Sequence, residues 1–136
     1  MTVLAFEPET EIEHQILKAQ NGEFSGDTLL RRIAEVNIYV PSTGEVHADG
    51  SGFSPVLLEQ DGLPFVAVFT AISRPPKDMA SYLMQMNGRE FFLRMPAGYG
   101  LIFNPGYEAQ MLVPPHGIAA FKRDLARSVA AARNPS

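Results

Sequence analysis

The chain has 136 residues, no cysteine and a formal net charge of −4. This length suits one domain that folds on its own hydrophobic core, and the lack of cysteine excludes disulfides, thiolate nucleophiles and thiolate metal sites. The mildly acidic charge argues against nucleic-acid binding, and no apolar run is long enough to cross a bilayer. We therefore expect one domain over residues 1–136, with an ordered core of about 8–132, and no nucleic-acid or membrane partner.

The start of the chain bears on its location. Residues 1–9 contain neither the basic start nor the long apolar stretch of a secretory signal peptide. The absence of cysteine also fits a reducing compartment. Together these observations favour a cytoplasmic protein.

Two short helices are predicted next. Thr10 and Glu13 have the spacing of a capping box, and an apolar stripe follows up to Asn21-Gly22, a typical helix end. Residues 25–27, Ser-Gly-Asp, predict a second helix start, and residues 29–34 supply its apolar face.

The middle of the chain predicts strands. Residues 36–40 form a strand pattern that stops at Pro41, and residues 42–54 read as a long polar loop. A hairpin is predicted from residues 55–59 and 63–70 around an Asp-Gly turn. Its second strand is apolar on both faces, so we expect that strand at the centre of a sheet.

The remaining elements mix helices and strands. In order, they are a helix over Lys77–Met86, a strand over Arg89–Met95, a strand over Leu101–Phe103, an edge strand over Glu108–Val113 and a helix from Pro114-Pro115. We expect Ile118, Phe121 and Leu125 to pack the last helix on the sheet. Without a βαβ rhythm, the pattern predicts an α+β fold whose mostly antiparallel mixed sheet is flanked by N-terminal and C-terminal helices.

The most distinctive local signal is a strand that runs directly into Asn104-Pro105-Gly106. Proline fixes φ, glycine supplies a positive φ, and asparagine can bond nearby backbone. We predict a sharp turn in which Asn104 satisfies backbone groups at the strand end and Gly106 takes a positive φ. The alternative hypothesis places the Asn104 side chain against a ligand.

The sequence contains no recognisable catalytic arrangement. His14, His47 and His116 are scattered, and His14 and His116 are typical of surface residues. Glu45, His47 and Asp49 alternate in the long loop and form a weak metal-site candidate, although turn residues of a solvated loop explain them more simply. We assign no catalytic residue, no metal and no cofactor. Whether the protein is an enzyme stays open, and we lean toward a non-enzymatic role.

The order of several segments resembles a known family. The segments are Ile38–Pro41, Leu63–Thr70 with its Phe-Thr end, Gly100–Gly106 with its Asn-Pro-Gly turn, and Leu112–Pro114 followed by Ile118. This order is similar to the SseB N-terminal domain family, named after a bacterial protein linked to enhanced serine sensitivity. The resemblance runs from about Ile12 to about Phe121. It implies no catalytic residues, because the activity of the family is not settled.

Two functions fit these observations. The first is a non-enzymatic module that binds another protein or a second copy of itself through methionine and aromatic side chains, namely Met84, Met86, Tyr99, Phe103, Tyr107 and Met111. These residues could instead be core, which we favour for Phe103. The second is a small-molecule binder or enzyme with a cleft near Thr70, Arg74 and Asn104.

The two functions predict different surfaces. A deep pocket beside the polar strand ends would favour a ligand, and an exposed apolar patch would favour a partner. The candidate ligand or partner residues are Thr70, Arg74, Tyr99, Asn104, Gly106 and Tyr107.

Overall fold

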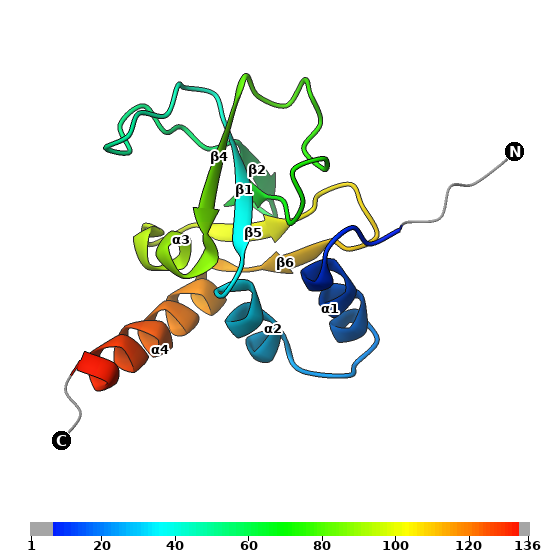
Figure 1. Cartoon of the computed structure of the whole chain (residues 1–136), viewed down its shortest axis with the longest axis vertical. Coiled ribbons are helices and arrows are strands. Elements are labelled where there is room, and N and C mark those ends of the chain that lie inside the picture. Colours follow the sequence, from blue (N-terminus) through cyan, green and yellow to red (C-terminus); the bar gives the residue numbers. More distant parts are fainter. Residues whose placement is uncertain (1–6, 134–136) are drawn as a thin grey trace, which may run out of the picture.

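A computed structural model describes residues 7–133, with side chains described up to residue 127. The chain folds into four helices and six strands, coloured along the sequence in Figure 1. They are α1 (Glu11–Gln20), α2 (Gly26–Ile33), β1 (Asn37–Ser42), β2 (Leu57–Gln60), β3 (Leu63–Val68), β4 (Tyr82–Asn87), α3 (Gly88–Arg94), β5 (Gly100–Phe103), β6 (Met111–Val113) and α4 (Pro115–Arg133). The predicted α+β fold class is confirmed.

The strands form two sheets. A four-stranded sheet has the order β2-β3-β5-β6, in which β3 and β5 are parallel and the other neighbours antiparallel. β1 and β4 form a separate antiparallel ribbon, which crosses in front of β5 and β6 in Figure 1. A single bridge between Tyr39 and Phe69 links the ribbon to the end of β3.

Strand β3 lies inside the four-stranded sheet, as predicted, and is buried on both faces. Val66 and Val68 contact the larger hydrophobic cluster, which includes the four helices, while Phe65 and Ala67 contact a smaller cluster on the opposite face. Alternate side chains of a strand point to opposite faces, so a strand covered on both sides must be apolar throughout.

The predicted N-terminal helices and the hairpin are confirmed. The side chains of Thr10 and Ser25 cap α1 and α2 by accepting backbone N–H groups. In the hairpin turn, Asp61 and Gly62 have φ values of 50° and 79°, the two positive values that a type I′ turn requires.

Two predictions between the hairpin and β5 are wrong. The helix expected over residues 77–86 is absent from the described structure, and residues 82–87 form β4. The strand expected over residues 89–95 is instead helix α3.

The reason for both errors is the Asn87-Gly88 pair. This pair starts a helix instead of ending one, because the Asn87 side chain accepts the N–H of Arg89 at 3.0 Å and caps α3. Gly88 is required by packing, since a Cβ there would overlap the carbonyl oxygen of Ile33. Phe91 and Phe92 are then buried on α3, and Met95, the residue that follows the helix, is buried as well.

Helix α4 packs against β5 and α3, as predicted for its apolar face. Ile118, Phe121 and Leu125 are buried, and the ring of Phe121 meets that of Phe92 edge to face at 5.1 Å between centroids. None of the helices within residues 7–133 is long and apolar enough to span a membrane.

Replacing Phe121 by alanine should lower the free energy of unfolding by about 3–5 kcal/mol, because a buried ring is lost and a cavity remains. Chemical denaturation monitored by circular dichroism measures this. A loss below about 1 kcal/mol would contradict the packing of α4 described above.

Candidate functional site

The polar strand ends predicted as a possible cleft form a buried hydrogen-bond network. At its centre is Glu13 of α1, whose carboxylate is fully buried. Arg74, in the segment after β3, donates to both carboxylate oxygens, from Nη2 to Oε1 at 2.9 Å and from Nε to Oε2 at 3.1 Å. Such a two-pronged pairing fixes both position and orientation. It fastens α1 to the segment that follows β3.

Thr70 and Asn104 extend this network to the end of β5. The Thr70 hydroxyl donates to Glu13 Oε2 at 2.9 Å and accepts from Asn104 Nδ2 at 2.9 Å. The Asn104 side chain also accepts the N–H of Thr70 at 3.1 Å and donates to the carbonyl of Ala109 at 3.1 Å. Asn104 therefore bonds backbone groups at the strand ends, as predicted, and its side chain is fully buried.

The turn after β5 has the positive φ predicted for Gly106 and a second one at Asn104 that was not predicted. Asn104 has a φ of 52° and Gly106 a φ of 90°. Asparagine tolerates this left-handed region better than most side chains, and glycine does so without cost. The exposed Gly106 N–H donates to the Gln110 side chain at 3.0 Å.

Tyr107 completes the network from the far side of the turn. Its hydroxyl donates to the carbonyl of Arg74 at 2.6 Å, and the Arg74 guanidinium lies 5.1 Å from the centre of its ring. Among the described residues, no buried side-chain nitrogen or oxygen lacks a hydrogen-bond partner. The network is thus internally satisfied, which is what a structural role requires.

The groups around Glu13 lower the pKa of its carboxyl group. Burial by itself raises the pKa of the carboxyl group, but hydrogen bonds from Arg74, the N–H of Glu9 and Thr70, together with the Arg74 charge, outweigh burial and lower the pKa below its usual value of 4.5. Glu13 is therefore ionised at neutral pH within a buried ion pair.

The weak metal candidate lies in the loop between β1 and β2. The carboxylate of Asp49 accepts the N–H of Ser51 at 2.9 Å, and the His47 N–H donates to the Ser51 carbonyl at 2.9 Å. Within residues 7–133, no group of three or more histidine, cysteine or acidic side chains is placed to hold a metal ion. The structure does not bring Glu45, His47 and Asp49 together as a metal site.

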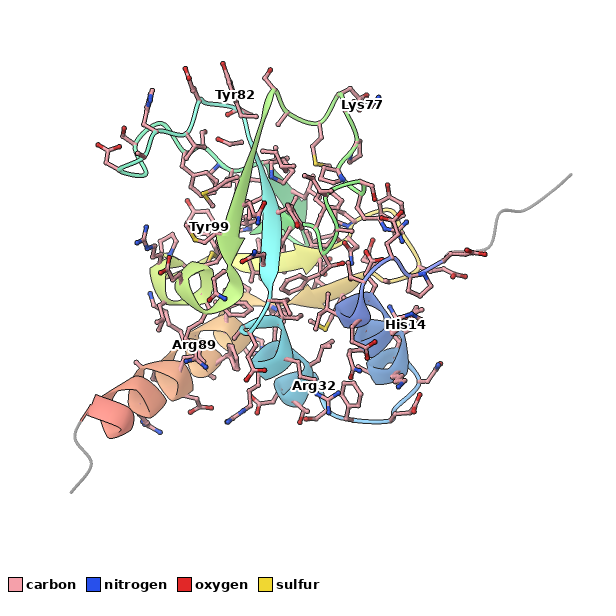
Figure 2. The ribbon with its side chains drawn as sticks, in the orientation of Figure 1. His14, Arg32, Lys77, Tyr82, Arg89 and Tyr99 are labelled. Atoms are coloured by element: carbon pink, nitrogen blue, oxygen red, sulfur yellow. The ribbon has the colours of Figure 1, made fainter. Side chains whose placement is uncertain are left out.

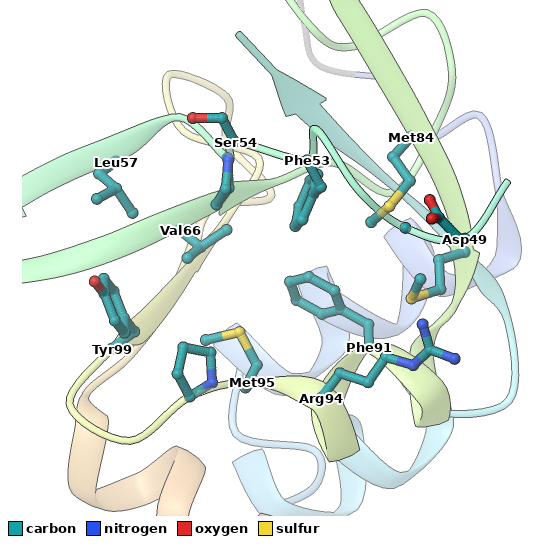
Figure 3. Close-up of a pocket in the computed structure, with 14 residues that line it drawn as sticks. Asp49, Phe53, Ser54, Leu57, Val66, Met84, Phe91, Arg94, Met95 and Tyr99 are labelled. Atoms are coloured by element: carbon teal, nitrogen blue, oxygen red, sulfur yellow. The ribbon is translucent and has the colours of Figure 1, made fainter. Parts of the chain in front are cut away.

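An apolar groove of about 480 Å³ lies elsewhere, between the β1–β4 ribbon, the hairpin and α3 (Figure 3). Its polar lining residues include Asp49, Ser54 and Arg94. Its apolar and aromatic lining residues are Phe53, Pro55, Leu57, Val66, Met84, Met86, Phe91, Met95, Pro96 and Tyr99. Methionines thus line it from both β4 and the end of α3.

Only part of this groove is predictable from the sequence. Tyr99, Met84 and Met86 were singled out as interface candidates, and all three line it. Phe103, by contrast, is fully buried in the larger cluster, as favoured above. The contribution of α3 was missed because residues 89–95 were read as a strand. A helical reading would have placed Phe91 and Met95 on one face.

The chain is therefore an α+β domain that combines a closed polar network with an open apolar groove. Its residues 12–120 match the family model described as SseB protein N-terminal domain. This match covers most of the chain, which belongs to the SseB N-terminal domain family. No curated protein and no solved structure shows significant similarity to it.

Replacing Asn104 by alanine should lower the free energy of unfolding by about 1–3 kcal/mol, because the Thr70 N–H and the Ala109 carbonyl lose their buried partner. Asn104→Gly is the matched control for backbone strain, since glycine keeps the positive φ while lacking the side chain. Thermal and urea unfolding measure both variants. A melting midpoint unchanged in Asn104→Gly would contradict the structural role.

The lowered pKa of Glu13 predicts an acid-sensitive fold. A carboxyl group whose pKa is lower in the folded state stabilises the protein above its unfolded pKa, and this contribution is lost as pH falls through the folded value. The free energy of unfolding should therefore fall below about pH 4.5, and Glu13→Gln should remove part of that slope. Urea titrations at a series of acidic pH values measure the slope. Identical slopes in the two proteins would refute this assignment.

Proposed function

We propose that this protein is a non-enzymatic, cytoplasmic interaction module, one domain that binds an apolar segment of a protein chain in the groove between β4, the hairpin and α3. The observation that carries the proposal is the methionine-rich lining, with Met84, Met86 and Met95 around one open space. Methionine is flexible and polarizable, so a surface rich in it adapts to apolar partners.

A large exposed apolar side chain at the groove favours a protein over a small molecule. Leu57 lines the groove and is nearly half exposed, whereas Leu83 and Tyr82 (Figure 2), which are also exposed, border a separate hollow beside Pro41 and Ile72. An exposed apolar side chain that adjoins an apolar depression is typical of protein interaction sites.

The alternative cleft near Thr70, Arg74 and Asn104 has weaker support. The Thr70 and Asn104 side chains are buried and already bonded to one another and to Glu13 or to backbone. A ligand site needs polar groups turned toward open space. Of the six predicted ligand or partner residues, Tyr99 is the one that lines the groove.

Two leucines offer a matched test. Leu57 on β2 and Leu63 on β3 are 48% and 43% exposed on the same hairpin, and Leu57 alone of the two lines the groove. Leu57→Glu places a charge at the apolar site and should reduce partner binding at least tenfold, whereas Leu63→Glu should leave it intact. Chemical cross-linking of tagged variants in the native host, followed by mass spectrometry of attached proteins, measures this.

The same samples distinguish the alternatives. Equal cross-linking by both variants would contradict binding in the groove. A small molecule that is extracted with the wild-type protein and with Leu63→Glu but not with Leu57→Glu would replace the protein partner with a ligand in the same groove. Unfolding midpoints of the two variants show whether either change acts through stability.

A further inference from the structure

The outer edge of β4 is unpaired. β4 has β1 as its neighbour on one side, and the described residues include no strand on its other side. In Figure 1 this free edge faces away from β1, with the loop after β1 above it and α3 below. The strand reads Tyr-Leu-Met-Gln-Met-Asn, so it has none of the charges or prolines that usually protect an edge from pairing with another chain.

The register identifies which backbone groups point outward. Tyr39 exchanges two hydrogen bonds with Phe69, at 2.9 and 2.8 Å, so its backbone groups face away from β4, and the Pro41 carbonyl likewise accepts a bond from the segment before β2. Their partners across the ribbon are Gln85 and Leu83. Bonded and non-bonded pairs alternate in an antiparallel ladder. The N–H and C=O groups of Leu83 and Gln85 therefore point away from β1, toward the free edge of β4.

The alternate residues of β4 face the groove. Met84 and Met86 line it, and they lie beside Val40 and Ile38 on the core-facing side of the ribbon. A strand added to the free edge would continue this face, since side chains of paired strands align across a sheet. Every second side chain of such a strand would then lie over the groove.

A charge lies beside this edge. Arg94, near the end of α3, lines the groove and is exposed, and no hydrogen bond or ion pair within residues 7–133 engages its guanidinium. Figure 3 shows it on the same side of the groove as Met84 and Asp49. The Asp49 carboxylate already accepts the Ser51 N–H. An unpaired guanidinium at an apolar site is complementary to a carboxylate.

We propose that the partner segment binds as an extended strand that pairs with the outer edge of β4 and places alternate apolar side chains in the groove, with a carboxylate opposite Arg94. The occupant is thus a segment of a partner protein, and its carboxylate is an acidic side chain or a free chain end. Backbone pairing at Leu83 and Gln85 supplies affinity, and the groove supplies specificity. This inference rests on the proposed function, because it specifies what the groove binds.

A library of immobilised random octapeptides tests the inference directly. The full chain should select peptides with apolar residues at alternate positions and at least one carboxylate. N-methylation of a selected peptide, one backbone nitrogen at a time, should weaken binding at every second position, because only alternate N–H groups of an added strand face β4. Fluorescence anisotropy with wild-type protein measures this pattern without any change to the protein.

Protein variants test the two recognition elements separately. Gln85→Pro removes the outward N–H of β4 and should weaken binding of the selected peptide at least tenfold, whereas Gln85→Ala keeps that N–H and should bind normally. Arg94→Gln should weaken binding about threefold to fivefold, the effect expected from the loss of an exposed ion pair. This variant should also bind a selected peptide and its carboxylate-free analogue with equal affinity. Arg89→Gln, on the same helix but outside the groove, is the matched control.

Several results would overturn the inference. The first is that no peptide is enriched, or that the enriched peptides have apolar residues spaced by three and four positions, as in a helix. The second is that the effect of N-methylation does not alternate along the peptide. The third is that sedimentation shows β4 pairing with a second copy instead. If selected peptides bind as helices and Leu57→Glu still abolishes their binding, the extended mode fails while the groove remains the site. If Leu57→Glu has no effect, the proposed function itself fails.

Discussion

The buried ion pair between Glu13 and Arg74 is the constraint on which the arrangement of this domain depends. A carboxylate withdrawn from water must have its oxygens hydrogen-bonded, and here the donors come from two parts of the chain: Arg74 and Thr70 after β3, and the backbone just before α1. Asn104 bonds the same threonine and so includes the turn after β5. The pair therefore fixes α1 against the ends of β3 and β5, and few alternative packings could satisfy it.

The groove follows from a separate feature, the crossing of the β1–β4 ribbon over the four-stranded sheet. The ribbon is connected to the sheet near Tyr39 and Phe69, and its other edge, along β4, is left without a neighbour. Helix α3 begins directly at the end of β4 and turns Phe91 and Met95 toward the space below the ribbon. A free edge and an apolar hollow thus lie side by side.

Local sequence signals predict the structure correctly where they agree with the tertiary environment. The cap at Thr10, the type I′ turn at Asp61-Gly62 and the doubly buried β3 each depend on residues adjacent in the chain or on a simple apolar pattern. The prediction is wrong over residues 77–95, where Asn87-Gly88 fits a helix end as well as a helix start. The choice was made by β1, which pairs with residues 82–87, and by the tight approach of Gly88 to α2.

The sequence by itself determined the fold class, most element positions, the family and the bonding role of Asn104, because capping, turn chemistry and apolar periodicity act over a few residues. Only the tertiary structure decided that Glu13, which has the spacing of a capping-box residue, is the buried partner of Arg74. It alone also placed methionines of β4 and α3 around one groove. Both arrangements join segments far apart in the chain, and such pairings are set by the packing of the whole domain.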